Sequence, residues 1–184
     1  MVSVERHGPW ALIVGGSEGI GEHLARLLGA AGINLVLVAR KPEPLAETAA
    51  AVRAETGVEV RTLALDVARP DMLERIRDVT DGLEVGLLVH NVGGGSGSGT
   101  LVEQPLETAL ATIAATPIAQ VKLAHHFGGA MAKRGRGGIL FIGSMAGNCG
   151  GYGIAAYSAA KAFSQILAEA LWAELESRGV DVLA

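Results

Sequence analysis

Short, almost uninterrupted apolar runs alternate with longer alanine-rich stretches along this chain of 184 residues. "WALIVG" comes first, and the "GIGEHLARLLGAAG" that follows has Ile20, Leu24, Leu27 and Ala31 at helical spacing, the face that we expect to be buried. Strands that are apolar throughout have both faces covered, and a helix between two of them is the crossover that parallel strands require. The alternation therefore predicts an α/β fold with a doubly wound parallel β-sheet and helices on both faces.

The same pattern predicts the order of the elements, and residues 1–184 are expected to form a single domain because no linker or internal repeat divides them. The glycine-rich run at 93–99 follows a strand end, so we interpret it as an active-site loop. Strands are expected at 10–15, 33–40, 58–66, 84–92 and 137–144, with a sixth from 179; helices are expected at 19–32, 42–57, 71–79, within 105–133, and from the region of Tyr157 to about 178.

Composition excludes several classes of function. A formal net charge of −4 without a basic stripe argues against nucleic-acid binding. The single cysteine, Cys149, allows neither an internal disulfide nor a cysteine-rich zinc site, and the adjacent His125 and His126 would point about 100° apart on a helix, so no metal site is expected. No segment resembles a signal peptide or a membrane span, so we expect no membrane association and a cytoplasmic location.

Two patterns carry chemistry. The first is "VGGSEGIG" at 14–21, where a strand meets a helix; glycines there let the backbone approach a pyrophosphate, although a plain tight turn would use them too. The second is Tyr157 with Lys161 one helical turn later, which is either a surface pair or a device that favours the ionised phenol. Neither pattern decides the function by itself.

Five features stand in one order along the chain: the glycine turn, Asp66 after the third strand, "HNVG" at 90–93, Ser144 after the fifth strand, and Tyr157 with Lys161. In this order the chain resembles the short-chain dehydrogenase/reductase family, in its compact branch of single-domain NAD(P)-dependent oxidoreductases. Val14 replaces the threonine of that family's T-G-x-x-x-G-x-G, and His90 and Val92 are departures from its N-N-A-G.

The resemblance implies a Rossmann-like NAD(P)-binding domain that interconverts a ketone and a secondary alcohol. Tyr157 would be the acid or base, Lys161 would lower its pKa and hold the nicotinamide ribose, and Ser144 would hold the substrate oxygen. Thr116 stands where the family has a relay asparagine, and Pro117 is expected to supply the helix kink found there. The implied cofactor contacts are Gly15, Ser17, Glu18, Gly19, Ile20, Gly21, Ala39, Arg40, Asp66, Val67, Asn91, Val92, Gly93, Tyr157 and Lys161.

The residues after the second strand bear on the choice of cofactor. Arg40 occupies the place where an acidic residue would select NAD, and its guanidinium can pair with a 2′-phosphate, which favours NADP (NADPH) over NAD. Glu18 argues the other way, because a carboxylate there would repel that phosphate unless it turns outward.

The altered "HNVG", Thr116 and the short C-terminus leave an alternative open: a non-catalytic dinucleotide-binding sensor or scaffold with the same fold. In the family, the long helix and the helix carrying Tyr157 pair across a two-fold axis, which implies a homodimer or homotetramer. The family also continues past the sixth strand, so we expect the C-terminal part, with its substrate-covering segment and last strand, to be missing from this chain.

Overall fold

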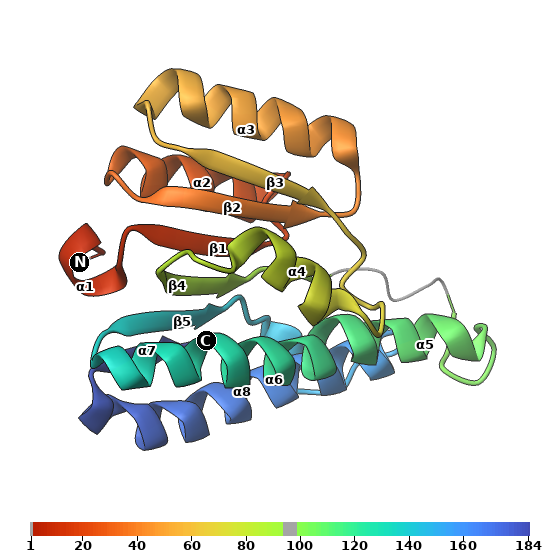
Figure 1. Ribbon diagram of the computed structural model, residues 1–184. Coiled ribbons are helices and arrows are strands. Elements are labelled where there is room, and N and C mark those ends of the chain that lie inside the picture. Colours follow the sequence, from red (N-terminus) through yellow and green to blue (C-terminus); the bar gives the residue numbers. More distant parts are fainter. Residues whose placement is uncertain (1, 94–98) are drawn as a thin grey trace.

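The computed structural model describes residues 2–93 and 99–184 and contains a parallel sheet of six strands in the order β3-β2-β1-β4-β5-β6 (Figure 1). The strands are β1 (Trp10–Val14), β2 (Asn34–Ala39), β3 (Val60–Ala64), β4 (Val85–His90), β5 (Gly137–Phe141) and β6 (Val180–Leu183). This is the Rossmann-like order, in which the chain direction across the sheet reverses between β1 and β4. The predicted fold class is confirmed, and each expected strand is present, most of them shorter where the chain turns out of the sheet.

Helices connect the strands, as the alternation predicted. Their bounds are α1 (Val4–His7), α2 (Gly19–Ala30), α3 (Pro42–Thr56), α4 (Met72–Thr80), α5 (Leu106–Ile113), α6 (Ala119–Leu123), α7 (Gly129–Arg134) and α8 (Ala155–Leu175), with 3-10 turns η3 (Met145–Gly147) and η4 (Glu176–Arg178). The short helix α1 has no counterpart among the predicted elements; its Arg6 donates to Asp181 of β6 at 2.6 Å and so ties the N-terminus to the last strand.

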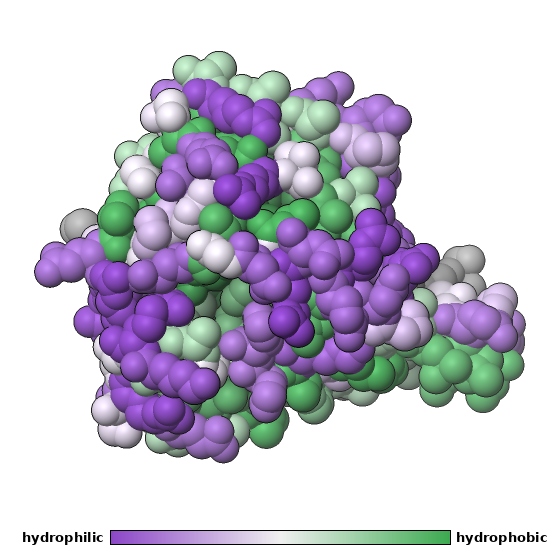
Figure 2. Space-filling view, viewed as in Figure 1, coloured by the Kyte–Doolittle hydropathy of each residue, from purple (hydrophilic) through white to green (hydrophobic). Residues whose placement is uncertain are grey.

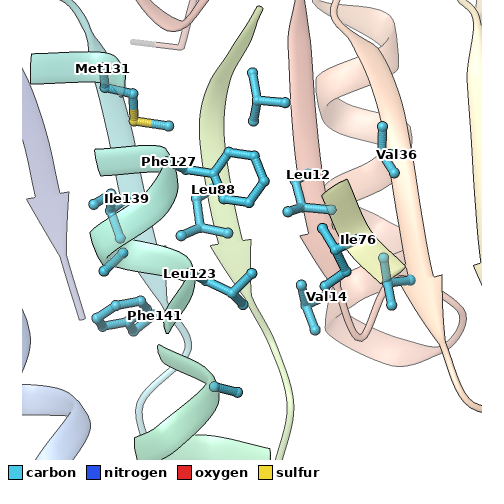
Figure 3. Packing of buried hydrophobic residues seen from close by; sticks show 14 of the residues in the cluster. Leu12, Val14, Val36, Ile76, Leu88, Leu123, Phe127, Met131, Ile139 and Phe141 are labelled. Atoms are coloured by element: carbon cyan, nitrogen blue, oxygen red, sulfur yellow. The ribbon is translucent and has the colours of Figure 1, made fainter. Parts of the chain in front are cut away.

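The two faces of the sheet have separate cores. Trp10, Leu12 and Val14 face α4, α8 and the long helix that runs from α5 to α7. Ala11 and Ile13 face α2 and α3, as the two-residue period of a strand requires. Figure 3 shows side chains of the long helix pointing at the first face of the sheet. Full burial of each such side chain contributes about 1.5–3 kcal/mol, so the sheet is stabilised from both sides.

The buried face of α2 differs from the one that the sequence predicted. Ile20 and Leu27 are 58% and 67% exposed, and α2 instead packs through Gly21, Ala25, Leu28 and Gly29. The prediction was wrong because apolar spacing alone does not account for side-chain size. The sheet and α3 approach this helix closely, so its small residues face inward: a Cβ added at Gly21 would lie 1.9 Å from the Gly15 carbonyl oxygen.

The long helix expected within 105–133 is present, but two π-helical turns interrupt it. α5 passes into η1 (Ala114–Ile118), α6 into η2 (Ala124–Gly128), and α7 completes the helix. Pro117 lies inside η1 and has no N–H to donate, so the irregularity expected at Thr116 and Pro117 takes the form of a widened turn. In the described part of the chain, no helix combines the length and the apolar character that crossing a bilayer requires.

We predict that Gly21→Ala lowers the free energy of unfolding by about 3 kcal/mol, because its Cβ would overlap the Gly15 carbonyl and force the first turn away from α2. Gly129→Ala is the matched control: its Cβ meets no described atom within 4 Å, and alanine in a helix raises stability by roughly 0.5–1 kcal/mol. Urea unfolding followed by circular dichroism measures both, and equal midpoints for the two variants would contradict the close contact.

Candidate active site

A cavity of about 720 Å³ opens at the carboxyl ends of β1, β2 and β4, at the point where the strand order reverses. Parallel sheets bind ligands at this position, because adjacent strand ends diverge there into loops that leave the sheet in opposite directions. The volume lies in the range of ordinary cofactor pockets. The cavity therefore has the place and the size for a dinucleotide.

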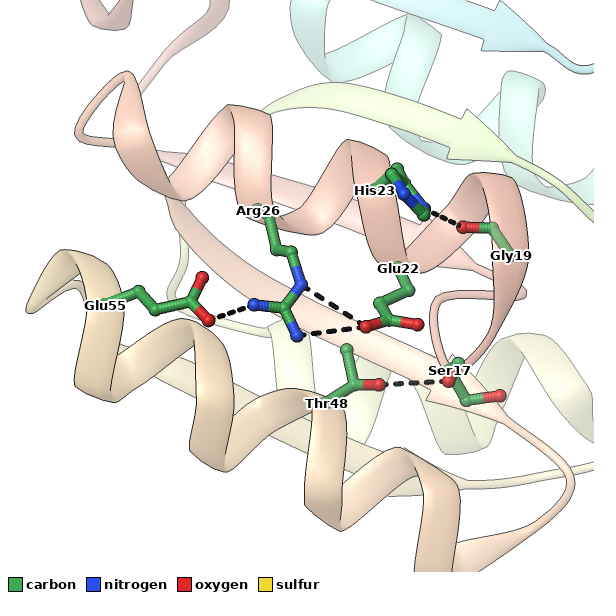
Figure 4. A network of polar contacts seen from close by, with 7 residues as sticks. All are labelled: Ser17, Gly19, Glu22, His23, Arg26, Thr48 and Glu55. Carbon is green, nitrogen blue, oxygen red and sulfur yellow. Dashed lines mark hydrogen bonds and ion pairs between the residues drawn. The ribbon is translucent and has the colours of Figure 1, made fainter.

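The glycine turn after β1 is held from two sides. Asn91, just after β4, donates its side-chain amide to the Gly15 carbonyl at 2.9 Å, and Gly15 has the left-handed φ of 88° that glycine permits. From α3, the buried Thr48 hydroxyl donates to the Ser17 carbonyl at 2.9 Å (Figure 4). These bonds fix a turn in which Gly15, Gly16 and Gly19 carry no side chain, so a pyrophosphate could approach its backbone closely.

The N-terminus of α2 is open toward the cavity. Glu18 is its N-cap residue but makes no side-chain capping bond within the described structure; its carboxylate instead pairs with Lys41 at 3.3 Å. The first amide groups of α2 thus remain available for a phosphate, which the helix dipole would also favour. The residues present therefore fit a dinucleotide. The ion pair with Lys41 also offsets part of the negative charge by which Glu18 would repel a 2′-phosphate.

The far end of the cavity carries Arg40 and Asp66, both exposed. Arg40 follows the last residue of β2, and Lys41 next to it also lines the cavity. Asp66 accepts the Ala68 N–H at 2.9 Å in a turn, which holds its carboxylate at the mouth of the cavity. Two cations and one carboxylate are therefore available to the adenosine half of a nucleotide.

Tyr157 and Lys161 both lie on α8, and their arrangement excludes a plain surface pair. Tyr157 is half-buried and lines the cavity, and the Lys161 Nζ lies 5.8 Å from the centre of its ring. Lys161 is only 2% exposed and donates to the carbonyls of Ile142 at 2.6 Å and Val92 at 3.2 Å. Burial lowers the pKa of Lys161 below its ordinary value. The ammonium is thus anchored beside the phenol by two strand-end carbonyls.

Ser144 and Thr116 stand differently toward the cavity. Thr116 is buried in η1 and contributes to the cavity wall. Ser144 is the N-cap of η3, where its hydroxyl oxygen accepts the Ala146 N–H at 3.2 Å, and it is not among the described residues that line the cavity. Its hydroxyl hydrogen is not used by that bond and remains available to a ligand.

The cavity gathers most of the residues that the sequence predicted for it. Gly19 and Gly21 shape the turn and α2, Lys161 lies behind Tyr157, and residues 94–98 of the expected active-site loop lie outside the described part of the chain. The predicted residues that line the cavity are Gly15, Ser17, Glu18, Ile20, Ala39, Arg40, Asp66, Val67, Asn91, Val92, Gly93, Thr116 and Tyr157.

Sequence reasoning missed one wall of the cavity. Lys41 could have been found from its place beside Arg40, but α5 gave no signal, because only tertiary packing decides which face of a helix meets a cavity. The unpredicted residues that line it include Lys41, Leu65, Ala68, Glu107, Thr108, Ala111, Thr112 and Ala115.

The fold and this cavity agree with comparisons to known proteins. The family model described as short chain dehydrogenase matches residues 9–184. A 7beta-hydroxysteroid dehydrogenase of Collinsella aerofaciens is 32% identical over 97% of this chain and 67% of its own length. A very-long-chain 3-oxoacyl-CoA reductase of Coprinopsis cinerea is 34% identical over 96% of this chain and 53% of its own length. The chain belongs to the short-chain dehydrogenase family, as its motifs predicted, and it spans about half to two thirds of these relatives.

Solved structures extend the likeness to three dimensions. A 7beta-hydroxysteroid dehydrogenase structure superposes with a TM-score of 0.94 at 31% identity, covering 99% of this chain and 70% of that one. A short-chain dehydrogenase from Sphingobium yanoikuyae in complex with NADPH gives 0.89 at 35% identity, covering 96% of this chain and 69% of that one. Neighbours of this kind bind nicotinamide dinucleotides, which agrees with the open glycine turn.

We predict that Asn91→Ala lowers the free energy of unfolding by about 1–2 kcal/mol, because the Gly15 carbonyl loses its donor. It should also weaken dinucleotide binding, since the glycine turn is then held from one side only. Asn148→Ala is the matched control, because Asn148 is exposed and should change stability by less than about 0.5 kcal/mol. Chemical unfolding and fluorescence titration with NADPH check the two effects, and unchanged binding in Asn91→Ala would count against this role.

Proposed function

We propose that this chain is an NADP(H)-dependent oxidoreductase that interconverts a ketone and a secondary alcohol, with Tyr157 as the acid/base. One observation carries the proposal: Tyr157 lines the same cavity as the open glycine turn, with the ammonium of Lys161 buried 5.8 Å from its ring. A surface pair would need neither the burial of Lys161 nor the two carbonyls that hold it.

Each catalytic residue has a role that follows from its chemistry. A bound nicotinamide dinucleotide would supply or accept the hydride. In reduction Tyr157 donates its phenolic proton to the carbonyl oxygen, and the nearby ammonium of Lys161 stabilises the phenolate that remains. Ser144 donates its hydroxyl hydrogen to the same substrate oxygen, and Thr116 takes the place of the family's relay asparagine in returning a proton to the site. In oxidation the proton moves in the opposite direction.

The preference for NADP is supported by the charges at the far end of the cavity. Arg40 and Lys41 line it together, and Glu18 is turned to Lys41 and away from a role as α2 cap. A 2′-phosphate would be attracted by both cations, and a guanidinium can bind it with two parallel bonds. The NADPH complex of the Sphingobium relative supports the same choice.

For the substrate we propose a ketone with a large apolar body. Both sequence relatives are named for such molecules, a hydroxysteroid and a very-long-chain oxoacyl-CoA. Between Ser144 and Tyr157 this chain exposes the large side chains of Met145 and Tyr152, at 85% and 91%. These could contact an apolar substrate from the rim.

We also propose that the protein is a homodimer or homotetramer, as the family resemblance implied. The long helix and α8 expose large apolar side chains, and Figure 2 shows one such gathering at the end of the long helix where α5 lies. Covering them against a second copy would remove apolar surface from water. The exposed residues on the two helices are Leu106, Leu110, Ile118, Val121, Phe163, Ile166 and Trp172.

We predict that Tyr157→Phe lowers ketone reduction at least about 100-fold while NADPH still binds, because only the transferable proton is lost. Tyr152→Phe is the matched control: it is the other tyrosine of the chain, 91% exposed, and it loses a hydroxyl but keeps the apolar ring proposed to contact the substrate, so turnover should stay close to that of the wild type. Coenzyme oxidation with a panel of bulky ketones measures the rate, and fluorescence titration measures binding. Tight NADPH binding without turnover in the wild type would favour the alternative of a dinucleotide sensor.

We predict that Arg40→Ala weakens NADPH binding roughly tenfold with little effect on NADH, since a charge-assisted bond to phosphate contributes about 1.5–3 kcal/mol. Glu18→Gln should act the other way and tighten NADPH binding at low salt, because it frees Lys41. Arg178→Ala is the control, an exposed arginine in η4. Parallel titrations with both coenzymes check this, and equal losses for NADPH and NADH in Arg40→Ala would contradict a 2′-phosphate contact.

A further inference from the structure

A chain of buried hydrogen bonds lies behind the cavity and belongs to none of the roles above. The Ser164 hydroxyl donates to the Gln120 side-chain oxygen at 3.0 Å, the Gln120 amide reaches His90 Nδ1 at 3.4 Å, and His90 Nε2 reaches the Ala115 carbonyl at 3.0 Å. The side chains of His90, Gln120 and Ser164 are fully buried. The chain of bonds thus joins α8, the long helix and the end of β4 through the interior.

The direction of this chain determines the tautomer of His90. A carbonyl oxygen can only accept, so His90 Nε2 must carry the hydrogen that is donated to Ala115. Nδ1 is then a lone pair, which accepts the amide N–H of Gln120, and the oxygen of that amide accepts from Ser164. The Ser164 hydroxyl also lies 3.1 Å from the Ala160 carbonyl. Turning the Gln120 amide around would set its oxygen against the Nδ1 lone pair, so the amide orientation shown is the one that suits a neutral Nε2–H imidazole.

The Ala115 carbonyl needs this donor because of the π-helical turn. In an α-helix it would accept the N–H of Ala119, four residues later. Here the Ala119 N–H bonds to the Ala114 carbonyl, five residues earlier, as a π turn requires. The carbonyl of Ala115 is therefore left without its α-helical partner inside the protein, where an unpaired acceptor is costly, and His90 replaces that partner.

We propose that His90 is a positioning residue: its neutral Nε2–H imidazole, oriented by Gln120 and Ser164, holds the widened turn open at Ala115 and thereby sets Thr116 and the helix of Lys161 around the site. Ala115 and Thr116 both line the cavity. Ser164 lies on α8 three residues after Lys161, and Asn91 to Gly93, which follow His90, form the floor on which Lys161 is anchored. The effect of His90 on the rate rests on the proposed function, whereas the chain of hydrogen bonds through His90 is independent of it.

The surroundings of His90 keep it neutral. Burial lowers its pKa to about 4, and the positive charge of Lys161 on α8 lowers it in the same direction. The ring packs edge-on to Phe141 of β5 at 6.3 Å, and its contacts on the long helix are the neutral Gln120 and the Ala115 carbonyl. One buried cation, Lys161, is held here by two carbonyls, and a second cation beside it would be repelled.

Two substitutions separate the hydrogen bond from simple packing. His90→Gln keeps a donor near the position of Nε2, whereas His90→Phe keeps a ring of similar size and leaves the Ala115 carbonyl unpaired. We expect His90→Phe to lower kcat about tenfold or more with an NADPH Kd within threefold of wild type, since a small displacement of catalytic groups costs rate before it costs binding. His90→Gln should recover most of that rate.

Nuclear magnetic resonance of protein labelled with ¹⁵N-histidine tests the chain without any turnover. The signals of the five histidines are separated by the loss of one in His90→Gln. We expect wild-type His90 as the Nε2–H tautomer, neutral down to about pH 5. Ser164→Ala removes a donor to the Gln120 side-chain oxygen but leaves the Ala115 carbonyl in place, so His90 should stay the Nε2–H tautomer while its Nδ1 signal shifts.

Thermal unfolding against pH supplies a second readout. The pKa of His90 is about 4 in the native protein and 6.5 ordinarily, so the unfolded chain binds this proton first and wild-type stability falls as pH decreases between these values. His90→Gln should lose less stability over the same window.

The outcomes are decisive in either direction. A wild-type His90 that is protonated at pH 6, or an Nδ1–H tautomer, overturns the proposal, as does a Ser164→Ala variant in which the His90 Nδ1 signal does not move. A kcat for His90→Phe equal to that of wild type overturns the positioning role. If His90→Phe does not fold, the rate of Ser164→Ala decides that point, with a decrease expected. If the wild type binds NADPH but turns over no ketone, the proposed function fails and the tautomer and pH measurements still test the hydrogen-bond chain.

Discussion

The contact between Gly15, Gly21 and Asn91 is the constraint on which the site depends. A Cβ added at Gly21 would lie only 1.9 Å from the Gly15 carbonyl oxygen. The helix α2 can therefore start at Gly19 only because residue 21 is a glycine. The Asn91 amide then binds the same carbonyl at 2.9 Å and links the ends of β1 and β4. The start of α2, the floor of the cavity and the gap between the two diverging strand ends all follow from this close packing of backbone on backbone.

Backbone carbonyls also organise the other half of the site. Those of Val92 and Ile142, at the ends of β4 and β5, bind the ammonium of Lys161, and that of Ala115 accepts from His90. Each of these oxygens lies where regular structure ends or widens, and among the described residues none has a ladder or α-helical partner that would compete for it. The desolvation of one lysine and one imidazole is offset by bonds that the fold would otherwise leave unmade.

Much of this architecture could be predicted from the sequence, because its causes are local. The apolar runs of β1 and β2 predicted strands with both faces buried, and the motif order predicted a family that the comparison with residues 9–184 confirms. The glycine turn, Asp66 and Tyr157 meet at one cavity as expected. The catalytic roles of Ser144, Tyr157 and Lys161 stay predictions, since geometry places side chains but does not measure a rate.

Residue type and spacing along the chain thus determined by themselves the sheet, its covering helices and which motifs would lie at strand ends. Only the tertiary structure decided which face of α2 is buried, because the closeness of the sheet and of α3 selects Gly21 and Ala25 over the larger Ile20 and Leu27. It likewise decided that Glu18 pairs with Lys41 and that His90 meets Ala115. Each of these depends on a partner 23 or more residues away in the chain, which no local pattern specifies.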